Sequence, residues 1–390
     1  MPIYLIILVT VLTHTSFKGS KVLISLYAIK LGANPLTIGV LFSMYSIFPV
    51  FLSLYAGKLS DRFGFRLPML FGACGLFAGL LLPFLMPHLA TLYFSAGLIG
   101  MCYIFYTVSV QHLIGSCGEG QERTRNYSLF SLGVALTALL GPTITGFAID
   151  LVGHRSTYLL LALFPALPIL VLLFFARLLP KAQIHSKPKL AQRVTDLVRI
   201  VPLRRVLVTA GIIETGLELF NFYLPIYAHS IGFSASHIGL VMGVFALAML
   251  LVRTVMPMLS RRFSEERVLS ASLLLAATSC LLFPLVSSFA LLLVMGFVLG
   301  LGLGCGSPLS MILAYNRSPA GRSGEAMGLR QTVNKATEAV VPLVFGLIGT
   351  AFGMVPVFWL DAVMLAVGGM LMHQDAAGRK VSEARGVGKR

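Results

Sequence analysis

The chain has 390 residues, of which 57% are hydrophobic and only 11% are charged, and its mean hydropathy is +0.89. About a quarter of the residues in a soluble domain are charged, so this composition excludes an ordinary soluble fold. Apolar runs of roughly 20 residues recur along the whole sequence, and each is long enough to cross a bilayer as a helix. The sequence therefore predicts an all-α membrane protein with many spans.

The net charge of +16 first suggests a nucleic-acid partner, but the positions of the basic residues argue against one. They lie in short loops between apolar runs, without interleaved aromatic side chains, which is unlike a nucleic-acid surface. The lipid bilayer is the expected partner, with some attraction to anionic headgroups. The five cysteines lack metal-ligand spacing and mostly fall inside apolar runs, so we expect no metal site.

Twelve helical spans are expected along the chain. In the first half they cover 3–29, 36–57, 67–86, 91–114, 125–149 and 156–178. In the second half they cover 203–228, 237–259, 267–286, 290–314, 325–350 and 355–373. We therefore expect two six-helix bundles, at 1–178 and 203–373, joined by a polar, basic linker at 179–202 and followed by a tail at 374–390.

Most Lys and Arg residues fall on one side of these spans. That side includes Lys58, Arg62, Arg66, Arg261, Arg262, Arg322 and the basic residues of the linker and tail. The opposite side has Lys30 and Arg155. Because Lys and Arg concentrate in cytoplasmic loops, both termini and the linker are expected in the cytoplasm.

The chain repeats itself at a constant offset of two hundred residues. Tyr27, Ala28 and Gly32 return as Tyr227, Ala228 and Gly232, and Pro142 and Gly146 return as Pro342 and Gly346. A constant offset over so much of the chain indicates two copies of one unit. Since both six-helix copies have the same orientation, an axis along the membrane normal must relate them.

Two motifs make this pattern more specific. The charged loop after the second span contains Gly57, Leu59, Asp61, Arg62, Gly64 and Arg66. It resembles the signature loop of the major facilitator superfamily, G-x-L-x-D-R-x-G-x-R, although Phe65 replaces the usual basic residue. In the fifth span, Gly141, Pro142 and Gly146 resemble the Gly-Pro motif of that superfamily, often called the antiporter motif, with Thr145 in place of one glycine.

The resemblance covers the whole chain and implies two pseudo-symmetric six-helix bundles around a central cavity for a small-molecule substrate. In the superfamily, the counterpart of Asp61 lies against a helix N-terminus of the second half, where the helix dipole favours negative charge. The counterpart of Arg62 joins this cluster, which latches the cytoplasmic side shut. A hairpin that only satisfies the topology is the alternative interpretation of this loop.

Charged residues inside the predicted spans point to a functional site. The first span carries, on one helical face, His14, Lys18 and Lys21. Two hundred residues on, the seventh span carries Glu214, Glu218 and Asn221 at the equivalent positions. A charge at mid-membrane costs roughly 2.5–3.5 kcal/mol, so these residues must face each other or a wet cavity. The repeat sets His14 against Glu214 and Lys18 against Glu218.

These pairs allow two interpretations. A glutamate that loses its lysine partner in one conformation would gain a proton there, which makes Glu218 and Glu214 the first candidate proton carriers. His14 is the second candidate, because histidine titrates near neutral pH. Static salt bridges between the two halves are the alternative.

The eleventh and eighth spans add further polar side chains. The eleventh carries at helical spacing Gln331, Asn334, Lys335 and Glu338. Lys335 and Glu338 are three residues apart and either pair locally or contact substrate. Arg253 in the eighth span either extends to the cytoplasmic surface or lines the cavity. In the glycine-rich tenth span, close packing is expected, and a gating bend near Gly304–Pro308 is a hypothesis.

We therefore expect a proton-coupled secondary transporter for an anionic or zwitterionic organic solute, because the candidate cavity charges lean basic. The Gly-Pro motif favours antiport and export. The basic first span, where multidrug exporters of the superfamily commonly carry an acid, leaves a proton-coupled uptake symporter for an organic anion as the alternative. A non-transporting receptor or scaffold on the same fold is a distant alternative.

No catalytic residue set and no nucleotide-binding loop occurs in the sequence. We therefore expect no enzyme activity and no cofactor, with the proton gradient as the energy source. The expected form is a monomer in a bacterial inner membrane.

Overall fold

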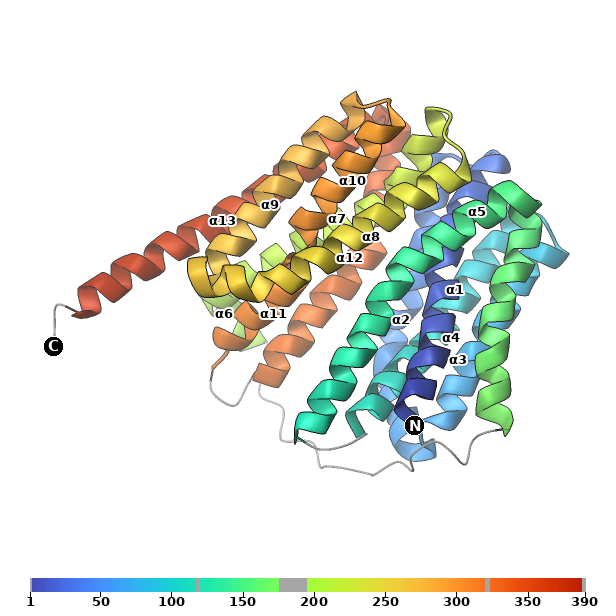
Figure 1. Ribbon diagram of the computed structural model, residues 1–390, viewed down its shortest axis with the longest axis horizontal. Coiled ribbons are helices and arrows are strands. Elements are labelled where there is room, and N and C mark those ends of the chain that lie inside the picture. Colours follow the sequence, from blue (N-terminus) through green and yellow to red (C-terminus); the bar gives the residue numbers. More distant parts are fainter. Residues whose placement is uncertain (1, 117–119, 175–194, 320–322, 388–390) are drawn as a thin grey trace. The chain divides into compact units, whose positions relative to one another are not determined.

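The computed structural model describes residues 2–116, 120–174, 195–319 and 323–387. Within these ranges all regular secondary structure is helical (Figure 1). Contacts divide the helices into two compact units. The first holds the described residues up to 174 together with Asn221–Gly243 and Pro342–Leu347, and the second holds the remaining described residues.

The first unit contains the helices of the N-terminal half. They are α1 (Pro2–Lys30), α2 (Pro35–Phe63), α3 (Arg66–Leu85), α4 (Leu89–Ser116) and α5 (Gly120–Phe174). α5 packs along α1, and α3 packs against α4 (Figure 1). Met69 and Ala73 of α3 form a buried apolar cluster with Tyr106 and Val110 of α4, so the predicted spans pack into one bundle.

α5 contains both the fifth and the sixth predicted spans, and it reverses direction at Gly153 (Figure 1). Gly153 has φ +79° and ψ 164°, a backbone conformation that side chains with a Cβ rarely adopt. Among the described residues, eleven helices are long and apolar enough to cross a membrane, and one of them is the 46-residue segment Leu129–Phe174. Because that segment turns back on itself, this count agrees with the twelve expected spans.

Two neighbouring residues, Asn34 and Pro35, deal with backbone N–H groups at the start of α2. Asn34 is the N-cap, and its Oδ1 accepts a hydrogen bond from the backbone N–H of Thr37 at 2.8 Å. Pro35 begins the helix, where its missing N–H leaves no donor to satisfy. These residues therefore deal locally with donors that the first turn of a helix would otherwise leave without an acceptor.

The second unit is built around the helices of the C-terminal half. They are α6 (Thr195–Arg199), α7 (Val201–Ser230), α8 (Ala235–Phe263), α9 (Glu265–Leu282), the short 3₁₀ helix η2 (Phe283–Leu285), α10 (Phe289–Gly304), α11 (Gly306–Asn316), α12 (Ser323–Phe352) and α13 (Val355–Val387). α13 packs along α9. One end of α7, one end of α8 and a short segment of α12 belong to the first unit.

The predicted tenth span is broken into two helices at Cys305. α10 ends at Gly304, and α11 begins at Gly306. A Cβ added to Gly302 would come within 2.8 Å of the backbone oxygen of Ser272, and one added to Gly304 within 2.8 Å of Cα of Met249. Glycine thus permits close packing, and the helix break lies where the sequence suggests a bend.

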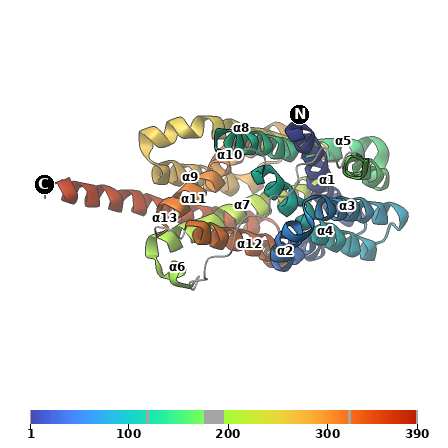
Figure 2. The ribbon, with the colours of Figure 1, turned by 90° about the horizontal axis from the view of Figure 1, so that it is seen from below.

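α13 is longer than the predicted twelfth span at 355–373. It continues as a helix to Val387, through residues that the sequence assigns to a tail (Figure 2). Asp375 lies just beyond the predicted end of the span, and its position on the continued helix allows it to contact two arginines.

A group of charged side chains joins several helices of the second unit at one end. Asp375 accepts a hydrogen bond from Arg205 of α7 and another from Nη1 of Arg317, which lies 2.6 Å from Oδ2. Nη2 of Arg317 lies 3.2 Å from Oε1 of Glu266 at the start of α9. Arg317, directly after α11, therefore ties α9 to α13. Sequence patterns do not reveal these contacts, because the residues are far apart along the chain.

We expect Arg317→Met to lower the free energy of unfolding by about 3–5 kcal/mol, because it removes the cation shared by two buried carboxylates. The side chains of Glu266 and Asp375 are only 2% and 9% exposed. Thermal unfolding of the purified protein in detergent measures the effect. Arg261→Met on α8 is the matched control, since Arg261 is exposed. Equal melting temperatures for the two variants would contradict the structural role of Arg317.

Candidate functional site

α1 is buried over most of its length although it carries many polar side chains. The hydroxyls of Thr10 and Thr13 donate to the backbone carbonyls of Ile6 and Val9, at 2.7 and 2.8 Å. Such bonds satisfy hydroxyl groups within the helix itself. His14 and Lys21 are only 5% and 7% exposed, and Lys18 is half-buried. α1 thus brings three basic side chains into the interior of the first unit.

Aromatic rings from α2 and α4 surround this part of α1. Phe17 stacks on Tyr103 with ring centroids 3.7 Å apart, and Tyr45 meets Phe17 edge-on at 5.6 Å. His14 lies edge-on to Tyr103 and Tyr106, at centroid distances of 5.3 and 6.1 Å. No described residue makes a hydrogen bond to Nδ1 of His14. The basic face of α1 is therefore bordered by aromatic surface, which suits both apolar and cationic contacts.

Lys21 leads to a second aromatic contact. Its Nζ lies 5.7 Å from the ring centroid of Phe42 on α2, within the range of a cation–π interaction. Phe42 packs against Phe222 of α7, with 5.2 Å between centroids. The adjacent Tyr223 donates its hydroxyl hydrogen to the backbone oxygen of Phe345 on α12 at 2.5 Å. These contacts connect Lys21 to the parts of α7 and α12 that belong to the first unit.

The Gly-Pro motif of α5 lies in close backbone contact with α1. A Cβ added to Gly141 would lie 2.8 Å from Cβ of Lys18 and 2.9 Å from the backbone oxygen of Thr15. A Cβ added to Gly19 would collide with Oγ1 of Thr145. Glycine on both helices therefore lets the two backbones approach, and this approach fixes the position of Lys18.

Another side of the same motif packs against the first turns of α8. A Cβ added to Gly239 would lie 2.6 Å from the backbone oxygen of Pro142, and one added to Gly146 would lie 3.2 Å from Cα of Gly239. The hydroxyl of Thr143 lies 2.8 Å from the backbone oxygen of Leu139 and 3.3 Å from that of Gly239. The motif therefore holds α5 against both α1 and α8.

In the second unit, charged side chains of α7 and α12 form a cluster around Lys335. Nζ of Lys335 lies 2.6 and 2.8 Å from the two carboxylate oxygens of Glu338, so the local pair suggested by their spacing is present. Lys335 also interacts electrostatically with Glu214 and Glu218 of α7. Glu218 is buried, and Glu214 is half-buried. One ammonium group is thus shared by three acids.

The remaining predicted residues of α12 have different surroundings. Arg330, one turn before the cluster, donates to the hydroxyl oxygen of Ser310 at 3.2 Å and interacts electrostatically with Glu214. Asn334 is buried, and no described residue makes a hydrogen bond to its Oδ1. Gln331 is exposed. Arg330 was not among the predicted site residues. Its electrostatic interaction with Glu214 makes it part of the cluster.

Arg253 of α8 is half-buried and contacts the broken helix. Its Nε donates to the backbone oxygen of Gly304 at 3.2 Å. Gly304 is the last residue of α10, and Pro308, four residues on, has no N–H to donate to its carbonyl. Arg253 therefore caps the end of α10, a role that neither of the two sequence interpretations included.

The predicted pairing between the two repeats involves residues of different units. His14 and Lys18 belong to the first unit, whereas Glu214 and Glu218 belong to the second. Pairing of His14 with Glu214 and of Lys18 with Glu218 stays a prediction. Asn221, half-buried on α7, belongs to the first unit.

Comparison with known proteins identifies the family. The family model described as Major Facilitator Superfamily matches residues 6–234 and 206–387. The chain belongs to this superfamily. It is therefore a member of a family of multi-pass membrane transporters, and the resemblance carried by the signature loop and the Gly-Pro motif is confirmed.

Curated relatives of this superfamily member include proteins named multidrug resistance protein MdtG. The one from Dickeya zeae (strain Ech586) is 25% identical over 371 residues, which cover 91% of this chain and 89% of the relative. The one from Proteus mirabilis (strain HI4320) is 25% identical over 374 residues, which cover 91% of this chain and 90% of the relative.

Solved transporter structures share the fold. A POT family transporter in complex with a thioalcohol-conjugated peptide has a TM-score of 0.79 at 17% identity, and the match covers 96% of each chain. The nucleoside transporter NupG has a TM-score of 0.77 at 14% identity, covering 96% of this chain and 99% of NupG. At these identities the likeness concerns the fold alone, and it confirms the predicted superfamily fold.

Part of the superfamily signature loop can be placed. Its side chains at Gly57, Asp61 and Arg62 lie outside the described residues, so the latch expected of them stays a prediction. Gly64 follows α2 with φ +77°. Arg66 donates from Nε and Nη2 to the backbone oxygens of Leu172 and Leu173, at 2.8 and 2.9 Å. Arg66 therefore ties the start of α3 to the end of α5.

Two acids that the sequence patterns do not single out have specific partners. The thiol of Cys280 on α9 donates to Oδ2 of the buried Asp361 on α13 at 3.3 Å. Asp150 of α5 accepts hydrogen bonds from the backbone N–H groups of Ala235 and Ser236, at 3.2 and 2.8 Å. The only sequence signal for either acid is its place within or next to an apolar run, and that signal does not identify the partner.

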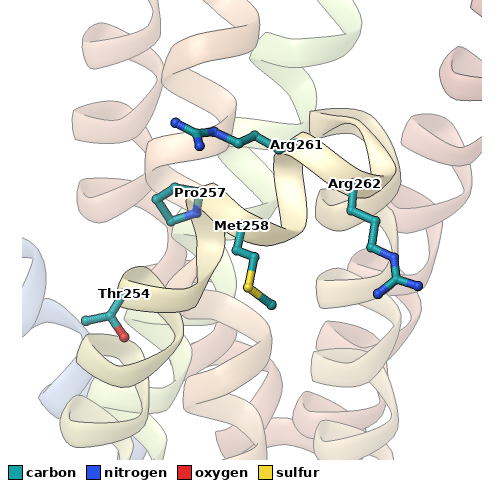
Figure 3. A pocket seen from close by; sticks show the side chains of 5 residues that line it. All are labelled: Thr254, Pro257, Met258, Arg261 and Arg262. Atoms are coloured by element: carbon teal, nitrogen blue, oxygen red, sulfur yellow. The ribbon is translucent and has the colours of Figure 1, made fainter.

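A hollow of about 550 Å³ lies along the last turns of α8 (Figure 3). Its lining residues are Thr254, Pro257, Met258, Arg261 and Arg262. All five are exposed, so the hollow is a surface groove. Pro257 and Arg261 stand where the first copy of the signature loop has Gly57 and Asp61.

We expect Gly141→Ala to destabilise the protein by about 1–3 kcal/mol, because the added methyl group would overlap with Lys18 and Thr15 of α1. Thermal unfolding in a single detergent measures the effect. Gly328→Ala on α12 is the matched control, since a Cβ there meets no described atom within 4 Å and alanine favours a helix over glycine. A melting temperature for Gly141→Ala at or above that of Gly328→Ala would contradict the close contact.

Proposed function

We propose that this superfamily member is a proton-coupled secondary transporter that exports a small anionic or zwitterionic organic solute by alternating access. The observation that carries the proposal is the charge cluster of α7 and α12 around Lys335. Its cations are Lys335 and Arg330, and its acids are Glu214, Glu218 and Glu338.

The acids gathered in this cluster support proton coupling. In the low dielectric of a membrane protein interior, each negative charge is costly unless another group compensates it. A bound proton on Glu218 or Glu214 would remove one of these charges. A positively charged side chain of the first unit would do the same, and Lys18 and His14 are the predicted candidates. A carboxyl group that has taken up a proton is neutral and attracts such a cation only weakly. Protonation and pairing between the two units therefore compete.

That competition would couple proton binding to the conformational change. In one state the base of the first unit neutralises the acid, and in the other state a proton does so. A ligand shifts such an equilibrium only by its different affinity for the two states, and the proton meets that requirement. Transport in one direction would then need a proton to be carried in the other.

The surroundings of α1 support the substrate class. Lys18 and Lys21 offer positive charge to an anionic group, and the stacked rings of Phe17 and Tyr103 offer flat apolar surface. A solute with one anionic group and an apolar or ring-containing body suits this combination. The Gly-Pro motif and the relatives named multidrug resistance protein support export over uptake.

Proton-coupled uptake of an organic anion is the second candidate. The basic face of α1 favours it, because a symporter would bind an anion and a proton together, and the added positive charges of α1 would attract the anion. The two candidates differ in the direction of proton movement, which a single assay measures.

We further propose that the protein lies in a bacterial inner membrane as a monomer, with both termini cytoplasmic. The distribution of Lys and Arg supports this orientation. Because one chain contains both halves of the repeat, no second subunit is needed to complete the transporter.

We expect Glu218→Gln to abolish substrate-dependent proton movement while leaving the protein folded, since glutamine has nearly the same shape but does not exchange a proton at neutral pH. The purified protein is placed in proteoliposomes, and the external pH is followed while organic acids, zwitterions and lipophilic cations are added in turn. Asp196→Asn on α6 is the matched control, because it removes an exposed acid outside the long apolar helices.

The sign of the pH change separates the candidates. External acidification on addition of a substrate supports antiport, whereas alkalinisation supports symport. A signal that persists in Glu218→Gln would contradict the role of Glu218 and transfer attention to Glu214 and His14. If no compound produced a pH signal and no compound was transported, that result would contradict the transporter proposal itself.

A further inference from the structure

The first turn of α8 is held by a residue of α5. A helix leaves its first backbone N–H groups without acceptors inside the helix. In α8, the N–H groups of Ala235 and Ser236 donate to Oδ1 and Oδ2 of Asp150, at 3.2 and 2.8 Å. The next N–H, of His237, lies 3.4 Å from Oγ of Ser234. The first two donors of α8 are therefore satisfied by a carboxylate that is more than eighty residues away in sequence.

The equivalent turn in the first repeat has different residues at these positions. At an offset of two hundred, Ser234 and Ala235 correspond to Asn34 and Pro35. Asn34, the residue directly before α2, caps the helix, and Pro35 has no N–H to satisfy. The residue equivalent to Asp150 is Thr350, which carries no charge. The two repeats have thus diverged in these residues, and the start of α8 has a carboxylate as its acceptor.

The contact occurs where the two halves of the chain meet in the first unit. Gly146, one helical turn before Asp150, packs against Ala235 and Gly239 of α8. The positive-inside rule places this end of the helices on the non-cytoplasmic side of the membrane, called extracellular below. Asp150 therefore lies at the extracellular edge of a close helix crossing, where any separation of α5 from α8 would break both of its hydrogen bonds.

We propose that Asp150 is an extracellular latch, whose carboxylate holds the N-terminus of α8 against α5 and thereby stabilises the state in which the extracellular side is closed. The inference rests on the proposed alternating access. Its charge matters because the N-terminus of a helix carries a partial positive charge, and bonds from backbone N–H to a carboxylate are stronger than bonds between neutral groups.

The latch has a defined effect on the two states. Opening the extracellular side exchanges the two bonds of Asp150 for bonds to water. Loss of an N-terminal acceptor of this kind shifts a folding equilibrium by about fivefold, within a range of about two- to thirtyfold. We therefore expect removal of the carboxylate to raise the ratio of open to closed extracellular faces by about fivefold, because the closed state alone contains the contact.

A cysteine reporter on α1 measures this ratio. Ser25 is buried and lies on the same helical face as Lys21, toward the extracellular end of α1. In cells that express Ser25→Cys, a membrane-impermeant maleimide added outside would react only when this face opens. The same protein without Ser25→Cys gives the background from native cysteines. His88→Cys, at an exposed position between α3 and α4, should react in every variant and verifies that this end faces outward.

We expect Asp150→Ala and Asp150→Asn to raise the labelling rate of Ser25→Cys, by about fivefold for alanine. Asn34→Ala is the matched control: it removes a helix cap at the same end, but that cap does not join two halves of the chain. Its labelling rate should stay at the level of the unaltered protein. An unchanged rate in Asp150→Ala, or an equal rise in Asn34→Ala, would overturn the latch.

Ala235→Pro gives a second test that does not depend on how the Asp150 variants fold. It copies Pro35 of the first repeat, so it suits the first turn of a helix, and it removes one of the two donors that bind Asp150. We expect a smaller rise in labelling than with Asp150→Ala. In the Ala235→Pro background, Asp150→Ala should add less than it does alone. Full additivity would show that Asp150 acts elsewhere and would refute the proposal.

The labelling assay needs neither substrate nor a proton gradient. If the latch proposal is wrong, the proton movement measured in proteoliposomes is unaffected. If the protein transports nothing, the labelling rates are unaffected. The two proposals can therefore fail separately.

Discussion

The close backbone contacts of α5 determine how the first unit is arranged. Gly141 touches α1 beside Lys18, and Gly146 touches the first turns of α8. Neither approach is compatible with a larger residue, because a Cβ would overlap with backbone atoms of the neighbouring helix. These contacts fix the height and rotation of α1, and thus the position of its basic face relative to the aromatic rings. They also bring Asp150 to the N-terminus of α8.

A second constraint is the cost of charge inside a membrane protein. The second unit meets it by sharing partners. Lys335 serves three acids of α7 and α12, and Arg317 serves Glu266 and Asp375. The two groups differ in what the sharing implies. The cluster around Arg317 joins helix ends and is balanced by a second cation, Arg205, as a structural tie should be. The cluster around Lys335 and Arg330 gathers three acids from two helices, and the proposed exchange of protons relies on these acids.

The two repeats keep the same framework while changing the chemistry at its joints. Arg66 and Glu266 occupy equivalent positions at the starts of α3 and α9. Arg66 binds the last carbonyls of α5, whereas Glu266 accepts from Arg317. The crossing of α5 with α8 has a counterpart in α2 and α12, where a Cβ on Gly39 would meet the backbone of Pro342. The glycine contacts are thus common to both repeats, and the charged contacts are specific to each.

The sequence by itself determined the spans, the twofold repeat, the superfamily and the helical faces that carry charge. These features depend on local properties: the length of an apolar run, the spacing of residues along one helix, and identity at a fixed offset. They also gave the pair Lys335–Glu338, since its members are three residues apart on one helix. The reversal at Gly153 left the span count intact, because a single glycine is enough to turn the chain.

Only the tertiary structure decided which distant groups meet. Arg253 reaches the Gly304 carbonyl, whose usual intrahelical donor would come from Pro308, a residue without an N–H. Arg330 joins the acids because its helix packs beside α7, and Asp375 meets two arginines because α13 continues past the predicted span. Asp150 reaches α8 through a glycine crossing between halves of the chain. Each partner depends on which helices are neighbours, and spacing along one helix carries no information about that.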